Sequence, residues 1–107
     1  AACQSLLGRL VMKNTEAKER SKVEMGKVYA TRGVLLSIPP EQIALAVARH
    51  LICDWGDLCE EDREINEDAY LNGGRLFSRY LTEDGEAFYV ITEADREMTT
   101  LLLPSEY

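Results

Sequence analysis

Residues 50–72 read HLICDWGDLCEEDREINEDAYLN, and residues 87–107 read AFYVITEADREMTTLLLPSEY. The first stretch places the single histidine and the single tryptophan of the chain beside a tight glycine-containing turn and a dense run of carboxylates. The second stretch places a polar segment, residues 92–96, between two apolar runs that are typical of β-strands. Together they predict a helix with a polar outer face that packs on a small antiparallel sheet.

The first predicted helix covers residues 39–53. Residues 37–41 read SIPPE, which is a typical helix start, because proline is tolerated in the first turn and a carboxylate favours the positive end of the helix dipole. Ile43, Val47 and Leu51 then follow at intervals of four residues and form one apolar stripe that faces a core.

The second predicted helix covers residues 57–72. Asp57 is its expected N-cap, with Glu60 at the spacing of a capping box. Its expected inner stripe consists of Leu58, Ile65 and Ala69, and residues 72–74, NGG, end it because they accept positive φ.

Strand-forming residues dominate the remainder of the chain. Residues 75–81, 86–92 and 98–104 predict three strands, the first two joined by a hairpin turn at TEDG, and short connections favour an antiparallel meander. Residues 27–31 and 34–38, separated by Gly33, predict one kinked strand or two short ones. The expected fold class is therefore α+β, with two central helices packed on a three- to four-stranded antiparallel sheet.

Length and composition indicate one globular domain, since the chain has 107 residues, 46% of them hydrophobic and 29% charged. We divide it into an N-terminal helical or mobile extension, residues 1–26, and a single α+β domain, residues 27–107. Its apolar runs are far shorter than the roughly 20 residues that span a membrane, and no basic region precedes the apolar patch near the N-terminus. We expect a cytoplasmic protein with no membrane partner.

The cysteines and short motifs offer no site for a bound group. Cys3, Cys53 and Cys59 are an odd number, which argues against a secreted disulfide scaffold. The spacing of His50, Cys53 and Cys59 matches no zinc pattern, and the chain has neither a glycine-rich phosphate loop nor a nucleophile elbow. We expect no metal and no cofactor.

Charge is distributed unevenly, because residues 54–107 hold fifteen of the 19 carboxylates but four of the 12 lysines and arginines. Such a surface repels a phosphate backbone, so we expect no direct nucleic-acid binding and a basic protein as partner. The residues predicted to bind the partner are Asp54, Trp55, Asp57, Glu60, Glu61, Glu64, Glu93, Asp95 and Arg96. Each of these side chains also has a structural alternative. The carboxylates would form a solvated helix face, Trp55 would be a wedge between the two helices, and Arg96 would be a structural clamp.

Any imidazole chemistry in this chain must use His50. Its place near the end of the first helix also suits a structural role, either at the negative end of the helix dipole or bonded to a carboxylate such as Asp54. Thr99 and Thr100 are neighbours on one strand, so their hydroxyls point to opposite faces of the sheet unless the strand bulges.

These motifs resemble a family of small proteins carried on bacterial plasmids and integrative elements, commonly labelled "plasmid-related protein" and sometimes "type I restriction subunit M". The resemblance covers residues 27–107 and rests on the His50 region, residues 54–57 (DWGD), Glu61-Asp62, Asn66, residues 91–96 (ITEADR), Thr99-Thr100 and residues 102–104 (LLP). This chain has Cys53 where the family has glycine, and a longer N-terminal extension. The family has no settled biochemical activity, so the resemblance implies a mobile-element setting.

The function that we predict is that of a non-enzymatic accessory protein of a bacterial mobile element. It binds a host or defence protein through its acidic surface, as an inhibitor of a nuclease or of a restriction- or CRISPR-type complex. One alternative is a small endoribonuclease-like toxin, in which His50 is the acid or base and Arg96 with Thr99 or Thr100 stabilises the phosphate. Another is a homodimeric structural protein whose exposed sheet face pairs with itself.

Overall fold

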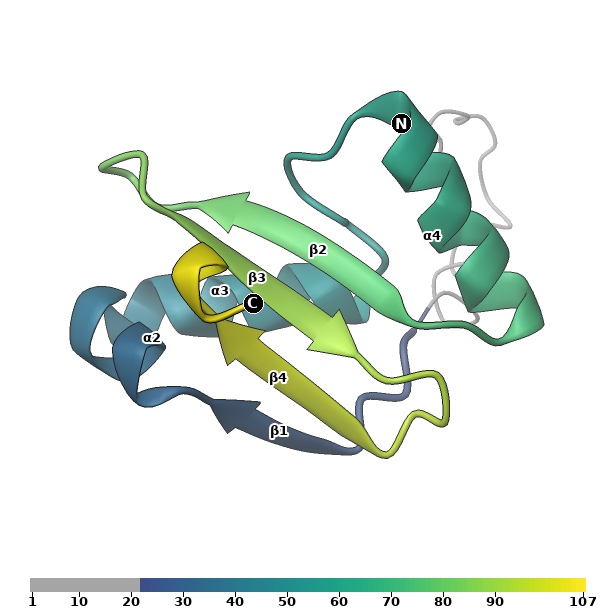
Figure 1. Ribbon diagram of the computed structural model, residues 1–107, viewed down its shortest axis with the longest axis horizontal. Helices are drawn as coiled ribbons and strands as arrows, with labels where there is room; N and C mark the ends of the chain where they lie inside the picture. The colour runs from purple at the N-terminus through teal and green to yellow at the C-terminus, as the bar shows by residue number, and fades with distance from the viewer. Residues whose placement is uncertain (1–21) are drawn as a thin grey trace, which may run out of the picture.

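The computed structural model describes residues 22–107, which form an α+β fold with a four-stranded sheet (Figure 1). The predicted fold class is confirmed. Residues 1–21, most of the predicted N-terminal extension, lie outside the described residues. In chain order the elements are β1 (Lys27–Ala30), α2 (Arg32–Ser37), α3 (Pro40–Leu51), α4 (Glu60–Asn72), β2 (Leu76–Leu81), β3 (Ala87–Thr92), β4 (Met98–Leu102) and a 3-10 turn, η2 (Pro104–Glu106).

The strands lie in the order β1-β4-β3-β2. β2, β3 and β4 form the predicted antiparallel meander, and the predicted hairpin turn closes with a hydrogen bond from the Gly85 N–H to the Thr82 carbonyl (2.9 Å). β1 pairs with β4 in parallel, which the sequence pattern did not predict. No helix within residues 22–107 is both long and apolar enough to cross a membrane.

Helices α2 and α3 cover one face of the sheet, here called the inner face, and η2 lies on the opposite, outer face (Figure 1). The main core forms where the alternating inward side chains of β2, β3 and β4 meet both helices. Its buried members are Val34, Ile38, Ala46, Tyr80, Phe88, Val90 and Leu101.

A second cluster fills the space between the end of α3, helix α4 and the beginning of β2. Its buried members are Val23, Cys53, Trp55 and Leu76, and Met25, Leu58, Ala69 and Tyr70 pack against them. Val23 and Met25 therefore belong to the packed domain, which includes residues ahead of the boundary expected at residue 27.

The prediction of a strand over residues 34–38 is wrong, because this segment lies in α2 and its C-cap. The Thr31 hydroxyl accepts a hydrogen bond from the Val34 N–H (3.2 Å) and thereby caps a helix of six residues. Local capping and the burial of Val34 and Ile38 override the strand propensity of the segment, and they leave Leu35 and Leu36 exposed.

The loop between α3 and α4 is longer than predicted. α3 ends at Leu51 rather than at residue 53, because Cys53 has a left-handed φ of 67°. α4 begins at Glu60, and Asp57 is not its N-cap; its carboxylate pairs with Arg79 instead.

The inner side of α4 also differs from the prediction. Ile65 is 61% exposed, whereas its neighbour Asn66 is buried. The Asn66 amide donates to the Phe77 carbonyl (2.6 Å), and its oxygen accepts from the Phe77 N–H (3.1 Å). The side chain thus satisfies both backbone groups of a strand residue, which an apolar residue could not do.

The loop between α3 and α4 covers the next backbone groups along the outer edge of β2, beside those that Asn66 binds. The Arg79 N–H donates to the Trp55 carbonyl (3.1 Å), and the Asp57 N–H donates to the Arg79 carbonyl (2.7 Å). Gly56 forms an isolated parallel bridge with Arg79 between these bonds. The residues that looked like a binding motif therefore close one edge of the sheet against pairing with another chain.

We expect Gly56→Ala to destabilise the fold more strongly than Gly85→Ala. Both glycines have a left-handed φ, 81° and 85°, so alanine costs about 1 kcal/mol at either position. At Gly56 the added Cβ would also lie 2.1 Å from the Arg79 carbonyl oxygen, whereas at Gly85 nothing lies within 4 Å. Urea unfolding should show an extra loss of at least about 2 kcal/mol for Gly56→Ala. Equal losses would contradict this account of the loop.

Candidate functional site

His50 is fully buried at the centre of the molecule, between the two apolar clusters. It lies in the last turn of α3, and its ring meets the Trp55 ring edge-on with centroids 5.6 Å apart. Its Nδ1 atom lies 2.6 Å from the Ser78 hydroxyl, and its Nε2 atom lies 2.9 Å from the Thr92 hydroxyl. The predicted bond from His50 to Asp54 is wrong, because Asp54 pairs with Arg49.

A continuous chain of hydrogen bonds starts at Ser78 and passes through His50. From Thr92 it continues to the Thr99 hydroxyl (2.7 Å), and Thr99 donates to the Met25 carbonyl (2.7 Å). Because that carbonyl can only accept, each hydroxyl must donate in the same direction, and the His50 Nε2 atom carries the ring proton. Ser78 then donates to Nδ1. The chain joins α3, three strands and the segment before β1.

The buried position determines the charge of His50. Burial, together with the positive charge of Arg96, lowers the pKa of His50 to about 4. The ring is therefore neutral at physiological pH and serves as one donor and one acceptor. A general acid or base must reach the proton that it transfers, and this ring is enclosed on both sides by the hydroxyls that it bonds.

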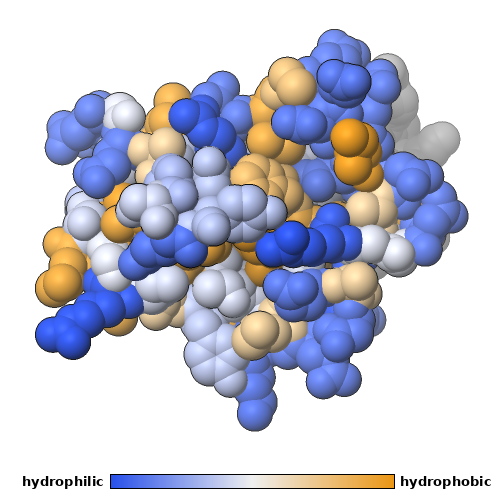
Figure 2. Space-filling view, viewed as in Figure 1, coloured by the Kyte–Doolittle hydropathy of each residue, from blue (hydrophilic) through white to orange (hydrophobic). Residues whose placement is uncertain are grey.

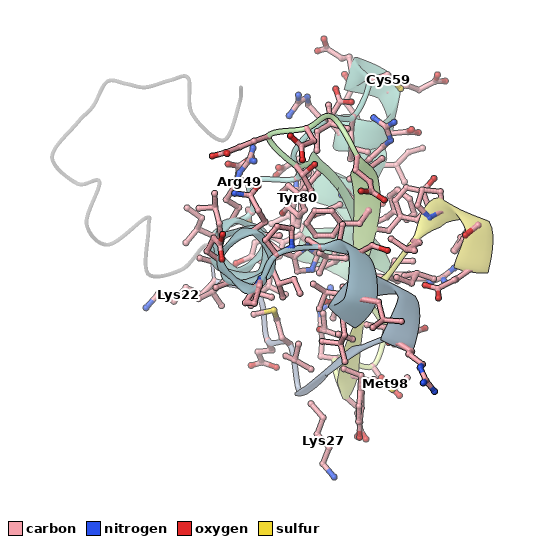
Figure 3. The ribbon with its side chains drawn as sticks, turned by 90° about the vertical axis from the view of Figure 1, so that its left-hand side faces the viewer. Lys22, Lys27, Arg49, Cys59, Tyr80 and Met98 are labelled. Atoms are coloured by element: carbon pink, nitrogen blue, oxygen red, sulfur yellow. The ribbon has the colours of Figure 1, made fainter. Side chains whose placement is uncertain are left out.

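The turn after α3 is held by a compact set of polar contacts. The Arg49 guanidinium binds Asp54 through two hydrogen bonds (2.7 and 3.2 Å) and lies 4.9 Å from the centroid of the Tyr80 ring (Figure 3). Burial alone would raise the pKa of Asp54, but Arg49, the Gly56 N–H and Arg63 hold it below its usual value. Asp54 is therefore a structural carboxylate.

Trp55 is the wedge that one of the predictions described. It is 1% exposed, and its indole N–H donates to the Glu67 carboxylate on α4 (2.9 Å). The Tyr80 hydroxyl donates to the Asp54 carbonyl (2.6 Å) just before it, and burial raises the pKa of that phenol. Trp55 thus joins α3, α4 and β2, and its ring is not available as a recognition surface.

Arg96 clamps the end of α4 to the turn between β3 and β4. Its guanidinium donates to the carbonyls of Ala69 (3.0 Å), Gly74 (2.5 Å) and Glu93 (3.2 Å). A positive charge at the C-terminus of a helix is favourable, because the carbonyls there carry partial negative charge. These bonds also help to hold Arg96 at its left-handed φ of 62°.

The four residues of the catalytic alternative do not meet at one surface. His50 and Thr99 are connected through Thr92, but both are fully buried. The Arg96 guanidinium is occupied by backbone carbonyls, and Thr100 pairs with Ile91 on the outer face of the sheet. The predicted opposite orientation of Thr99 and Thr100 is confirmed by their burial.

The predicted binding carboxylates divide into three groups, of which the first, Asp54 and Asp57, forms ion pairs with Arg49 and Arg79. Glu60, Glu61 and Glu64 are exposed on α4. Glu93 lies 3.8 Å from the Arg75 guanidinium, and Asp95 accepts a hydrogen bond from the Glu97 N–H (3.0 Å) in the β3–β4 turn. Only the α4 group combines exposure with a regular spacing along one element.

Sequence reasoning missed Ser78 and Thr92 as partners of His50. Their signal is the pattern of β2 and β3, where each lies at a position that alternation places on the inner face among apolar residues. A polar residue at an inward position needs a buried partner. The chain has one histidine, so a buried His50 ring was a candidate partner for both hydroxyls, and their positions on the inner face indicated where that ring would lie.

No three His, Cys, Asp or Glu side chains among residues 22–107 are grouped so that they could hold a metal ion. Comparisons of the chain with models of protein families, with curated proteins and with solved structures found no match. The resemblance to plasmid-related proteins therefore stays a prediction that rests on the motifs quoted above.

We expect the stability of the protein to fall between pH 7 and pH 5. The folded-state pKa of His50, about 4, lies below the unfolded value of 6.5, so the unfolded chain gains a proton in this range and the folded chain does not. The contribution is present above pH 6.5 and is lost as the pH falls toward 4, which amounts to about 2 kcal/mol between pH 7 and pH 5. Urea unfolding at both pH values measures it.

His50→Gln is the control for this pH dependence. Glutamine offers one donor and one acceptor group but does not titrate, so the variant should be less stable at pH 7 and should lose the difference between pH 7 and pH 5. An unchanged difference in this variant would assign the pH dependence to other groups.

We also expect Arg96→Met to destabilise the fold by about 2 to 3 kcal/mol, since it removes charge-assisted hydrogen bonds to the end of α4. Arg96→Lys should recover part of this loss, because an ammonium keeps the charge but not the planar set of donors. Thermal unfolding followed by circular dichroism measures both variants. Full stability in Arg96→Met would show that the clamp is dispensable.

Proposed function

We propose that this protein is a non-enzymatic binding protein whose helix α4 presents an acidic face, bordered by exposed apolar side chains, to a basic protein partner. The observation that carries the proposal is the arrangement of exposed side chains on α4. Glu61, Glu64 and Asp68 follow one another at helical spacing in one row, and Ile65 and Leu71, which are 61% and 74% exposed, lie on either side of this row. Figure 2 shows mostly hydrophilic surface over this helix, with a small hydrophobic area within it.

The apolar residues of this face argue for a partner rather than for a solvated surface. α4 already packs its other side through Asn66, Ala69 and Tyr70, so Ile65 and Leu71, which are mostly exposed, add little to the packing of the fold. Helix faces that bind grooves use apolar anchors at intervals of three, four and seven residues. Ile65 and Leu71 are six residues apart, about 120° around the helix axis, so they lie on the two sides of the carboxylate row rather than on one line.

The carboxylates of this face specify the charge of the partner. A groove lined by lysine and arginine, with apolar surface at its rims, would complement Glu61, Glu64 and Asp68, and such complementarity raises the association rate and rejects wrong partners. The same charges repel nucleic acid, which supports a protein partner. Through the resemblance to plasmid-related proteins, the partner would be a host or defence protein, such as a nuclease or a restriction- or CRISPR-type complex.

An endoribonuclease is less well supported by the contacts. Its acid or base would be His50, which is enclosed by Ser78 and Thr92, and its phosphate ligand would be Arg96, which binds carbonyls of α4 and the β3–β4 turn. Neither residue has an exposed functional group directed to the same surface. We therefore propose the binding function alone.

The proposal is tested by affinity capture from a bacterial host lysate, with and without nuclease, followed by quantitative mass spectrometry. We expect a protein partner that survives nuclease treatment and is reduced at least about tenfold by Glu61→Lys/Glu64→Lys, because the variant reverses two charges at the interface. Ile65→Ser should reduce it as well, because it removes an apolar anchor.

The matched control is Glu83→Lys/Glu86→Lys, which makes the same change in net charge at the exposed β2–β3 turn. It should leave capture unchanged. Equal losses of the captured partner in both charge variants would show that the interaction depends on net charge alone. That result would exclude α4 as the specific surface. Recovery of RNA, or loss of every partner after nuclease treatment, would reject the proposed function.

A further inference from the structure

The two edge strands of the sheet differ in whether another segment of the chain covers their free edge. The outer edge of β2 is closed by Asn66 and residues 55–57, but within residues 22–107 no segment pairs with the outer edge of β1. The Lys27 N–H donates to the Glu97 carbonyl (3.1 Å), and the Thr31 N–H donates to the Leu101 carbonyl (3.0 Å). Since alternate residues of a parallel strand bond the same neighbour, Val28 and Ala30 direct their backbone groups outward.

Exposed apolar side chains gather around this open edge. Among the described residues, five of the eleven large hydrophobic residues that are exposed lie on β1, on α2 or at the start of β4. Figure 2 shows hydrophobic surface at the α2 end of the molecule, and Figure 3 shows Lys27 and Met98 together at one end, far from Cys59. The five are Val28 (45%), Tyr29 (50%), Leu35 (63%), Leu36 (78%) and Met98 (39%).

Natural proteins protect an edge strand with charges, proline or a covering segment. β1 has one charged residue, Lys27, at its beginning, and its other three residues are Val28, Tyr29 and Ala30. An open edge with apolar residues on both sides is a surface suited to the addition of another strand.

We propose that β1 pairs with β1 of a second copy of this chain, antiparallel around a two-fold axis, so that the two sheets become one continuous eight-stranded sheet. The outward backbone groups determine the register. Val28 of each copy exchanges both main-chain hydrogen bonds with Ala30 of the other, and Tyr29 faces its counterpart across the axis as a closely spaced pair. Aromatic residues in such pairs stabilise a sheet.

The charge pattern of β1 is compatible with a second copy as the occupant, because its one charged residue does not meet itself across the axis. In this register Lys27 lies opposite Thr31, so that the two Lys27 side chains do not face each other. Arg32, the first residue of α2, lies beyond the strand, and the opposite end of the strand carries Glu24 and Glu97 as well as Lys27. The register therefore places no like charges directly opposite one another within the strand, an arrangement that would be destabilising.

The interface also extends beyond the strand itself. A standard interface buries roughly 800 Å² on each partner, which is more than a four-residue strand supplies. Leu35 and Leu36 on α2 and Met98 on β4 flank the strand and add apolar area on both sides of it. Antiparallel pairing brings these flanks together in both copies, so the strand and its surroundings form one self-complementary surface.

Sedimentation velocity of the full chain over about 1 to 200 µM tests the proposal, and a monomer–dimer equilibrium within this range is expected. Tyr29→Lys should weaken the dimer at least about tenfold, because it opposes two ammonium groups across the axis. Val28→Pro should weaken it too, since it removes an outward N–H while the bonds from Lys27 and Thr31 to β4 remain. Leu71→Lys, the same type of change on α4, should leave it unchanged.

Cross-linking tests the register independently of the weakened variants. With Cys3 and Cys59 replaced by serine, Tyr29→Cys should form an intermolecular disulfide under mild oxidation, because the opposed Cα atoms of such a pair lie about 4.5 Å apart. Leu71→Cys in the same background should not. Circular dichroism checks that each variant is folded. A chain that stays monomeric throughout this range, a dimer that Tyr29→Lys leaves intact, or a Tyr29→Cys chain that does not cross-link would overturn the proposal.

Discussion

The fold depends on one buried imidazole. His50 lies where α3 crosses the middle of the sheet, and its two ring nitrogens connect β2 through Ser78 and β3 through Thr92, from which the chain of bonds reaches Thr99 and the Met25 carbonyl. Buried polar groups are tolerated when all of them are satisfied, and a satisfied network admits one arrangement of the elements that contribute to it. The imidazole must stay neutral to donate at one nitrogen and accept at the other. His50, which lies near Arg96, is therefore a structural residue rather than an acid or base.

The second constraint is the outer edge of β2. A strand edge needs partners for its backbone groups, and here they come from the Asn66 side chain and from residues 55–57 rather than from another strand. This solution requires a glycine at residue 56, where a Cβ would collide with Arg79, and a left-handed residue at Cys53 to turn the chain toward the edge. The contacts of Trp55 with Glu67 and of Arg96 with Ala69 then hold α4 against the sheet.

Much of this architecture could be predicted from the sequence, and the exceptions share one physical cause. The meander, the turn at Gly85 and helix α3 follow from periodicity and turn residues, which are local properties. The α2 segment, the orientation of α4 and the parallel pairing of β1 depend on contacts between distant residues. Ile65 has a more apolar side chain than Asn66, yet Asn66 is buried, because the unpaired backbone groups of Phe77 need it. For the candidate site, residue types indicated chemistry, but the burial of His50 and Trp55 and the backbone hydrogen bonds of Arg96 assigned these residues to the scaffold.

The two proposed surfaces lie at opposite edges of the sheet, since α4 packs beside β2 and β1 is the last strand on the other side (Figure 1). Binding at one therefore does not cover the other. A dimer formed through β1 carries one α4 at each end of the continuous sheet, so it presents two acidic faces on one rigid body. A partner with two copies of the complementary basic groove would then be bound with an affinity above that of either face alone, provided that its spacing matches the sheet. Self-association and partner binding would thus reinforce each other without sharing a residue.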